Sequence, residues 1–558
     1  MPCWCLMGPR SHEPQPASLR TVRVHAPSAS AVRVQVRPCH APTGETSVAA
    51  RHDAADGRWV AEFEAFAGDH YWLVVDDGPP LLDPHSLDVA FTDAGPVSVV
   101  RDPWEVHPQA APLRHAPVVY EAHVKGFGGS YLGCIDRLDH VVHTGANVLE
   151  LMPVHPFDDS DNYWGYMPLV WGAVHRGYAR DHSRAAEELA ELVAAAHRRG
   201  LHVWLDVVFN HTGDDGLAHP VRSLRGLDER GLYRHHADGR PTNDSGCGND
   251  VDPSHPYIRS LVLEGLDRLA DLGVDGFRFD LASLLTRDGG GLVDRITEWG
   301  RRRGVTLVAE AWDLGAYQVG HGWPWPEWLQ WNDRFRDTVR SFLRGEPGMV
   351  HALSQRVQGS PDLFGADGRA RTLNFVTAHD GLTMHDLTTL TSDRHRSWDC
   401  GPELRLQQLQ NYFTLLLLSA GAAMWVMGDE FARTQQNHDN PYNIDGPLTH
   451  VDWASASEWR RLTEAVRTLT RLRRSRPPTE FRFYGVGAQM DDGPNSHSLA
   501  WSSNGLYVMA NAWWEPLTFE IQEPGEWRTV VASAPARHRK RLVDVAPRSV
   551  VVLQRIAG

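Results

Sequence analysis

Short runs of alternating apolar and polar residues fill most of the first hundred positions. Four of these runs, separated by Gly, Pro and Asp, read TVRVHA, AVRVQVRP, RWVAEFEAF and HYWLVVDD. A period of two is typical of strands that bury one face. The pattern predicts a small antiparallel β-sandwich over residues 17–105, preceded by a disordered segment at residues 1–16.

From Ala116 onward, buried-strand runs alternate with amphipathic helices. One helix is predicted at residues 183–200, with Ser183 as its N-cap and Gly200 at its end. The apolar runs that predict strands are VVYEAHV, NVLELMPV, LHVWLDVVFNH, VDGFRFDLA, TLVAEAWD, TLNFVTAHD and AAMWVMGDE. About eight strands over this length predict a (β/α)₈ TIM barrel spanning residues 106–476. From the pattern alone, a doubly wound open sheet remains an alternative, although no G-x-G-x-x-G turn follows a strand.

The helical pattern stops after Arg476. The remaining chain carries short strand-like runs, namely FRFYGVG, HSLAWSS, GLYVMANAWW, LTFEIQ, WRTVVAS and RSVVVLQRI. These runs predict a C-terminal antiparallel β-sandwich over residues 477–558.

Charge and composition narrow the range of partners. The 558 residues include 55 Lys and Arg against 70 Asp and Glu, a formal net charge of −15. This balance argues against nucleic-acid and anionic-membrane partners, which require a basic face, and suits a neutral polysaccharide. The six cysteines are scattered, no eighteen-residue apolar run occurs, and the first residues do not resemble a signal peptide. We therefore expect a cytoplasmic protein.

Polar side chains end four of the predicted barrel strands. In a TIM barrel these strand ends meet at one face, where catalytic groups gather. The residues concerned are Asp206, Asn210 and His211, then Arg278 and Asp280, then Glu310, and finally His379 and Asp380. Four such endings in one sheet favour a functional site over isolated turn caps.

The chemistry of these groups is consistent with glycoside hydrolysis. Arg278 and Asp280 are two residues apart and share a strand face, so the guanidinium would keep the carboxylate ionised, as a nucleophile requires. Glu310 lies in an apolar strand, where burial would raise its pKa and suit it to donate a proton. Two carboxyl groups in contrasting environments are what glycosidases use. A barrel-mouth network of ion pairs without catalysis remains the alternative reading.

Four motifs carry a resemblance to a known family. DVVFNH, GFRFD, the Glu of VAEAWD and TAHD resemble the hallmark segments of the α-amylase superfamily, glycoside hydrolase family thirteen, in the same order. The resemblance implies that Asp280 is the nucleophile, Glu310 the general acid/base and Asp380 the transition-state stabiliser. The substrate-binding residues that it implies are Tyr166 of NYWGY, Asp206, His211, Arg278, Trp312 and His379.

Longer stretches narrow the resemblance to isoamylases and bacterial glycogen-debranching enzymes. They include YEAHVKGF, LELMPVHPF, SGCGNDVDPSHP, AEAWDLGAYQVG and GDEFARTQ. The group implies a glycogen-binding-type N-terminal module and hydrolysis of α-1,6 branches in glycogen, amylopectin or limit dextrins. A branching transglycosylase or a maltooligosyltrehalose trehalohydrolase with the same triad is one alternative, and a non-catalytic glucan-binding subunit is another.

No cofactor is expected to be required. Asn147, in GANVLEL, corresponds to a calcium-binding region of true amylases, but no cluster of oxygen ligands accompanies it in the sequence, so calcium is unsupported. The segment after Asp380 departs from the group, because only TSDRHR precedes SWDCG where a long polar insertion is usual. Such loops shape the side of the site that holds the leaving group.

Overall fold

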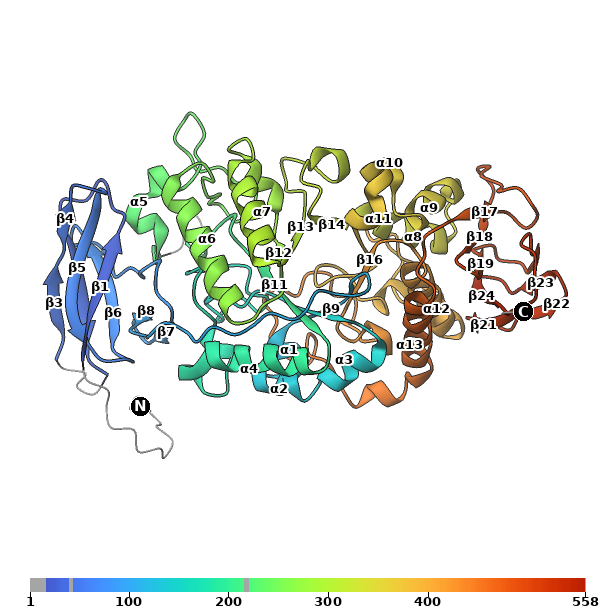
Figure 1. The fold of residues 1–558 in the computed structure, drawn as a ribbon, viewed down its shortest axis with the longest axis horizontal. Coiled ribbons are helices and arrows are strands. Elements are labelled where there is room, and N and C mark those ends of the chain that lie inside the picture. The colour runs from blue at the N-terminus through green and yellow to red at the C-terminus, as the bar shows by residue number, and fades with distance from the viewer. Residues whose placement is uncertain (1–16, 40–43, 215–219, 557–558) are drawn as a thin grey trace.

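The chain folds into an elongated arrangement of three parts. The computed structural model describes residues 17–39, 44–214 and 220–556, so the predicted disordered segment at residues 1–16 lies outside the described residues. In Figure 1 the N-terminal sheets lie at one end, the barrel in the middle and the C-terminal sheets at the other end. None of the helices in the described ranges combines the length and apolar composition that a membrane crossing requires.

The N-terminal part consists of two antiparallel sheets, in the orders β1-β5-β4 and β3-β2-β6-β8-β7. The four alternating runs seen in the sequence form β1, β2, β5 and β6, whose apolar positions point into a shared core. The strands are β1 (Ser18–Val24), β2 (Val32–Arg37), β3 (Thr46–Ala49), β4 (Arg51–Asp53), β5 (Arg58–Ala65), β6 (His70–Val75), β7 (Val89–Thr92) and β8 (Gly95–Val99).

Eight parallel strands close into the predicted barrel, in the order β9-β10-β11-β12-β13-β14-β15-β16 with β16 returning to β9. The strands are β9 (Val118–Ala122), β10 (Val148–Leu151), β11 (His202–Val207), β12 (Gly276–Phe279), β13 (Thr306–Ala309), β14 (Leu329–Asn332), β15 (Thr372–Phe375) and β16 (Ala422–Val426). The prediction of a TIM barrel is confirmed, and the open doubly wound sheet is excluded.

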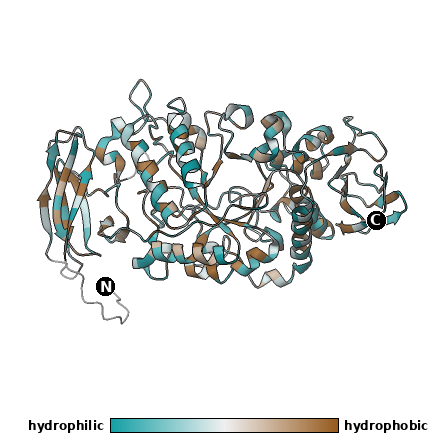
Figure 2. Cartoon of the chain, in the orientation of Figure 1, coloured by the Kyte–Doolittle hydropathy of each residue, from teal (hydrophilic) through white to brown (hydrophobic). Residues whose placement is uncertain are grey.

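Helices connect and surround these strands. They are α1 (Val124–Gly128), α2 (Tyr131–Ile135), α3 (Leu138–Thr144), α4 (Ala185–Arg198), α5 (Leu224–Leu232), α6 (Pro256–Asp271), α7 (Gly291–Arg303), α8 (Asp333–Arg344), α9 (Met349–Val357), α10 (Pro361–Phe364), α11 (Gly368–Arg371), α12 (Pro402–Leu417) and α13 (Arg460–Ser475). Figure 2 shows hydrophobic barrel strands at the centre and helices of mixed character around them. Between β13 and β14, a stretch described throughout, the chain forms a 3₁₀ turn at Gly320–Gly322 and no α-helix.

The start of α4 differs from the prediction. Ser183 is not its N-cap, because it lies inside a 3₁₀ turn, His182–Arg184, that precedes the helix. Asp181 caps this turn by accepting a hydrogen bond from the backbone N–H of Ser183 at 3.0 Å. A carboxylate two residues upstream therefore takes the capping position. Gly200, with a φ of 76°, follows the end of α4 as predicted.

The C-terminal part again consists of two antiparallel sheets, in the orders β17-β18-β19-β24-β21 and β20-β23-β22. The strands are β17 (Arg482–Tyr484), β18 (Ser498–Ser503), β19 (Leu506–Asn511), β20 (Leu517–Glu520), β21 (Trp527–Ala532), β22 (Arg537–Arg539), β23 (Leu542–Val545) and β24 (Ser549–Arg555). Apolar residues of both sheets, such as Met509 and Val543, share one core, as expected of a sandwich.

Along a barrel strand, every second residue faces the interior of the barrel. Trp204 of β11 fills its lower part and lies directly across from Gly276 of β12. A Cβ atom at position 276 would approach Cδ1 of Trp204 to 2.5 Å, so glycine leaves room for the indole. Two residues further along the same strands, Asp206 pairs in register with Arg278. The polar residues inside the barrel therefore begin with Asp206 and Arg278, two residues beyond Trp204 and Gly276 toward the carboxyl ends of the strands.

Candidate active site

A pocket of about 280 Å³ opens where the barrel strands end. The residues around it include eight of the nine site residues that the sequence predicted; Asp206 lies just beneath, bonded to Tyr166. The lining residues are Trp164, Tyr166, His211, Ser245, Cys247, Arg278, Asp280, Leu281, Glu310, Trp312, Trp331, Arg336, Phe375, Ala378, His379 and Asp380. Residues from five separate strand ends thus meet in one cleft.

Arg278 is the centre of the site. Its guanidinium is 1% exposed and bonds to three carboxylates. Nη1 donates to Asp206 Oδ2 at 2.7 Å and to Asp280 Oδ1 at 3.2 Å. Nη2 donates to Glu310 Oε2 at 2.7 Å. One guanidinium therefore holds Asp280 and Glu310 as neighbours, an arrangement compatible with the separation of about 5–5.5 Å found in retaining glycosidases.

Aromatic rings hold Arg278 in place. Cζ of Arg278 lies 4.2 Å from the centre of the Trp331 ring and 6.0 Å from that of Tyr166. A guanidinium between aromatic rings is attracted to the ring faces and loses rotational freedom. The two rings therefore limit the directions in which the guanidinium can present its nitrogens.

Asp280 is held from its other side by Asn210. Nδ2 of Asn210 donates to Oδ2 of Asp280 at 2.9 Å and to the backbone oxygen of Asp280 at 2.7 Å. Asn210 therefore holds both the side chain and the backbone of Asp280, on the side away from Arg278. Immediately after Asp280, Leu281 adopts the left-handed conformation with a φ of 40°, which is uncommon for a residue with a side chain.

The left-handed backbone at Leu281 directs its N–H to the carboxyl group of Glu310. The N–H of Leu281 donates to Oε2 of Glu310 at 3.0 Å, the same oxygen that Arg278 contacts. Burial raises the pKa of Glu310 to about 7, with Arg278 opposing the rise and the Asp280 carboxylate adding to it. Since both hydrogen bonds use Oε2, Oε1 is left to carry the proton. These features suit a proton donor at neutral pH.

A second cluster surrounds His379. Its Nδ1 lies 2.7 Å from Oε1 of Glu121, and its ring stacks on Tyr166 with the ring centres 4.9 Å apart. Burial alone would lower the pKa of His379, but contact with Glu121 raises it above the ordinary value. The hydroxyl of Tyr166 donates to Asp206 Oδ2 at 2.5 Å. Burial raises the pKa of Asp206 to about 6, against the opposing effect of Arg278.

The three remaining predicted residues, Asp380, Trp312 and His211, also line the pocket. Asp380 is exposed, and its side chain has no hydrogen bond or ion pair with any described residue. Trp312 is half-buried and both lines the pocket and packs against the core. Nε2 of His211 contacts the backbone oxygen of Tyr166 at 2.6 Å, which couples the loop after β11 to the loop that carries the tyrosine.

Below the pocket lies a carboxyl group with no partner. Glu150 of β10 is 1% exposed, and neither of its carboxyl oxygens has a hydrogen-bond partner in the described part of the chain. Burial raises its pKa well above the ordinary value, and Glu121 and Asp206 add to the rise. Burial therefore favours the neutral form of Glu150, since a charge here would be neither paired nor hydrated.

Sequence reasoning did not assign Glu121, Glu150 or Trp331 to the site, and it noted Asn210 only as a strand ending. The sequence could have indicated Glu121 and Glu150, because each is a charged residue within an otherwise apolar strand. No comparable signal marked Trp331, because β14 was not among the predicted strands.

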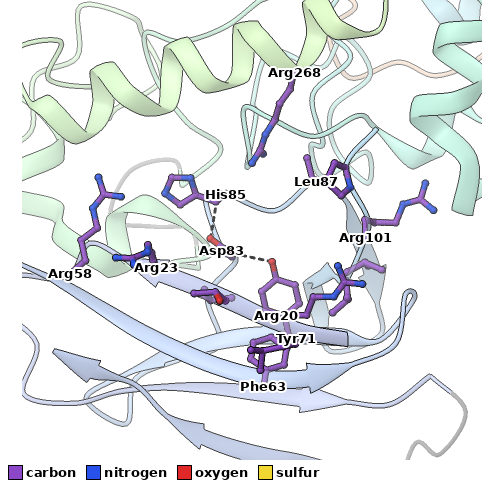
Figure 3. Close-up of a pocket in the computed structure, with 16 residues that line it drawn as sticks. Arg20, Arg23, Arg58, Phe63, Tyr71, Asp83, His85, Leu87, Arg101 and Arg268 are labelled. Carbon is purple, nitrogen blue, oxygen red and sulfur yellow. Dashed lines mark hydrogen bonds between the residues drawn. The ribbon is translucent and has the colours of Figure 1, made fainter. Parts of the chain in front are cut away.

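Other candidate residues lie outside the pocket. Asn147 is at the start of β10, at the opposite end of the barrel, where its Oδ1 accepts the backbone N–H of Val118 at 2.7 Å. Glu430, which follows strand β16, bonds to Tyr120 of β9 at 2.9 Å and to His140 of α3 at 2.6 Å, a structural role. A larger pocket of about 500 Å³ lies between the N-terminal sheets and the barrel and contains none of the predicted site residues (Figure 3).

Comparison with known proteins identifies related sequences. The family model "Alpha amylase, catalytic domain" matches residues 91–225. The chain is 35% identical over 492 residues to the "Glycogen operon protein GlgX homolog" of Mycobacterium tuberculosis, covering 76% of this chain and 67% of that protein. It is 34% identical over 470 residues to the "Glycogen debranching enzyme" of Klebsiella pneumoniae, covering 74% and 69%.

Plant relatives are longer than this chain. "Isoamylase SU1, chloroplastic" of Zea mays is 33% identical over 462 residues, which cover 69% of this chain but 57% of the maize protein. Among solved structures, a pullulanase of Anoxybacillus complexed with maltotetraose superposes with a TM-score of 0.83 at 22% identity, covering 98% of this chain and 87% of that one. At this identity the structural likeness shows the shared fold alone.

Proposed function

Because the chain belongs to the α-amylase family, in its isoamylase and glycogen-debranching group, we propose that it hydrolyses α-1,6 branch linkages of glycogen, amylopectin or their limit dextrins. One observation carries this proposal. A single guanidinium, that of Arg278, bonds to both Asp280 and Glu310 at the base of one pocket. Two carboxyl groups beside one sugar are what hydrolysis with retention requires.

In the first step, an oxygen of Asp280 attacks the anomeric carbon of the branch sugar. Glu310 donates its proton to the departing glycosidic oxygen as the carbon–oxygen bond breaks. The product is a covalent glycosyl-enzyme on Asp280, and the main glucan chain leaves with the donated proton. Arg278 and Asn210 each donate to a carboxyl oxygen of Asp280 and so position it for the attack. The pKa of Glu310, raised to about 7, keeps the donor protonated below that pH.

In the second step, Glu310 is a carboxylate and takes a proton from a water molecule. The water oxygen attacks the anomeric carbon, the bond to Asp280 breaks, and a linear oligosaccharide is released. Both carboxyl groups return to their starting states. These steps use side chains of this chain and water, with no added cofactor.

The surrounding groups bind and shape the sugar. We assign Asp380 the stabilisation of the oxocarbenium-like transition state, since its free carboxylate faces the pocket. Tyr166 offers an aromatic face, and His379 offers its Nε2 to a sugar hydroxyl, since its Nδ1 is bonded to Glu121. His211 contacts protein oxygens through both ring nitrogens, so we assign it the positioning of Tyr166 at the wall of the pocket. Trp312 extends the aromatic wall at the rim. The N-terminal sandwich is proposed to hold the glucan as a binding module.

Product analysis tests the proposal. The purified protein is incubated with glycogen, pullulan and phosphorylase-limit dextrin, and the released chains are sized. We expect linear maltooligosaccharides from the branched glucans, and none from the Glu310→Gln variant. Formation of new branches on amylose without release of chains would identify a branching transglycosylase. Glucan binding without any product would identify a non-catalytic subunit.

A further inference from the structure

Two histidines and one aspartate meet where the N-terminal sandwich joins the barrel. His25 follows strand β1, Asp228 lies within α5, and His255 is the N-cap residue of α6. One ligand atom from each of the three lies within 4.8 Å of those of the other two. All three side chains are partly buried, and none of them lines the pocket at the strand ends. We propose that His25, Asp228 and His255 form a zinc site that clamps the N-terminal sandwich to the barrel.

The position of His25 is fixed by neighbouring rings. Its imidazole stacks on Tyr257, with ring centres 4.9 Å apart and an angle of 26° between the rings. The edge of His255 meets the same imidazole at 5.0 Å. These contacts direct Nε2 of His25 to Oδ2 of Asp228, 3.3 Å away. A ring that is held before a metal arrives loses little freedom on binding.

The carboxylate of Asp228 is held as well. The residue has φ −162° and ψ 80°, which interrupts α5. Its Oδ1 accepts the backbone N–H of Gly231 at 2.9 Å. A Cβ atom at position 231 would come within 2.2 Å of Oδ2, so glycine leaves room for the carboxylate. Oδ2 is therefore the oxygen presented to the histidines.

The donor set selects the metal. Two imidazole nitrogens and one carboxylate oxygen suit Zn²⁺, with bonds of about 2.0–2.2 Å and water as a fourth ligand, whereas Ca²⁺ and Mg²⁺ prefer oxygen alone. The three ligand atoms already lie within 4.8 Å of one another, and binding would draw them closer around the ion. Nδ1 of His255 accepts the N–H of Tyr257 at 3.2 Å, a long bond. Zinc at Nε2 of His255 would place the ring proton on Nδ1. The hydrogen bond from Tyr257 would then be lost, and the bond to zinc would take its place.

Zinc held in this way would join two parts of the chain. His25 belongs to the N-terminal sandwich, whereas Asp228 and His255 follow strand β11 of the barrel. Because the three ligands come together only in the folded chain, bound zinc stabilises that state. The inference does not depend on the proposed glycosidase activity.

A titration with zinc chloride tests the site in the full-length chain. The protein is first dialysed against a chelator, then titrated by calorimetry and analysed for metal content after gel filtration. We expect one Zn²⁺ per chain at micromolar concentration and a zinc-dependent rise in the Tm. His25→Ala and Asp228→Asn should each weaken binding at least about 100-fold, since loss of a mere orienting partner already costs about 10–100-fold.

Two further variants separate metal binding from packing. His255→Asn removes the imidazole but keeps a residue type that caps helices well, so its fold is retained while zinc binding falls. His85→Ala is the matched control, because His85 lies between the N-terminal sheets and the barrel (Figure 3). His85 contacts Tyr257 and Glu264 but is not part of the cluster. Wild-type protein without bound zinc would overturn the proposal. Equal zinc content in wild type and in a His25→Ala/Asp228→Asn double variant would do so too.

Discussion

The carboxylate of Glu121 in strand β9 lies 2.7 Å from Nδ1 of His379, which follows strand β15. The two residues are 258 positions apart in the chain and meet because β16 pairs with both β15 and β9. Both side chains are buried, Glu121 to 1% exposure. Contact with this carboxylate raises the pKa of His379 although burial lowers it. A residue of the first barrel strand therefore raises the pKa of a histidine at the pocket.

Glu121→Gln is expected to lower the pKa of His379. Burial still disfavours the charged ring while the opposing negative charge of Glu121 is lost, so the pKa of His379 falls. In the wild type, His379 keeps its positive charge to a pH above the ordinary histidine pKa. In the variant, it loses this charge at a lower pH. An NMR titration measures the pKa of His379, whose signal is assigned by its absence from a His379→Asn variant. In steady-state kinetics of the Glu121→Gln variant, KM should rise more than kcat falls. A His379 pKa unchanged from wild type would contradict the assignment.

Glu310→Gln is expected to reduce kcat by about three orders of magnitude or more, because proton donation and its coupled steps are lost. Glucan affinity should be largely retained, since the amide keeps the size of the side chain. Turnover on limit dextrin and binding by affinity electrophoresis measure the two effects. Turnover near the wild-type rate would remove Glu310 from its assigned role.

The pH dependence of kcat/KM should follow the proton on Glu310. Its pKa is raised to about 7 by burial, so the donor is protonated below that pH and ionised above it. We therefore expect kcat/KM to fall as pH rises through 7, by about tenfold for each further unit. A pH–rate profile on limit dextrin measures this alkaline limb. A profile that stays level well into the alkaline range would show that another group donates the proton.

Asn210→Ala should slow the chemical step. The variant removes both hydrogen bonds to Asp280, and we expect kcat to fall about 10–100-fold with little change in KM, as for loss of a residue that orients a reacting group. Asn249→Ala is the matched control, because this buried asparagine donates to Thr212 and makes no contact with Asp280. Steady-state kinetics distinguish the two variants, and an equal loss in both would indicate a general loss of packing.

Asn332→Ala should destabilise the barrel. Oδ1 of this buried residue accepts the N–H of Phe335 at the start of α8, and Nδ2 donates to Ser360 and Thr372, each at 2.9 Å. Loss of the cap and of the bonds to buried hydroxyls should lower the free energy of unfolding by about 2–4 kcal/mol. Urea denaturation measures the shift against Asn495→Ala, an exposed position. Equal midpoints for the two variants would contradict this role.

The barrel strands were predictable to the extent that apolar runs marked them. Strand β14 is the exception, because its sequence LQWN carries two amides. Asn332 is satisfied by its cap and hydroxyl contacts. Oε1 of Gln330 accepts the N–H of Gly320 at 2.8 Å, but its Nε2 has no hydrogen-bond partner among the described residues. A strand that buries two amides has no continuous apolar run, so hydrophobic pattern alone does not reveal it.

Some contacts of the candidate active site were predictable from the sequence, and others were not. Arg278 and Asp280 could be placed together because they are two residues apart in one strand, and Glu310 because it ends the neighbouring strand in the barrel order. Contacts that depend on barrel closure were not predictable, and Glu121 beside His379 is the clearest case. The left-handed backbone of Leu281, which directs an N–H to Glu310, also has no sequence signal, since leucine rarely adopts it.

The pairing of β16 with β9 has a consequence for synthesis of the protein. Translation delivers β9 first and β16 last, and until residue 426 has left the ribosome the edge of β9 has no strand beside it on that side. A growing chain must therefore keep an unpaired strand edge from aggregating during most of barrel synthesis. Nascent chains that stop short of β16 would carry Asp280 and Glu310 yet lack the closed ring that supports them, so active protein is expected only from ribosomes that complete the barrel.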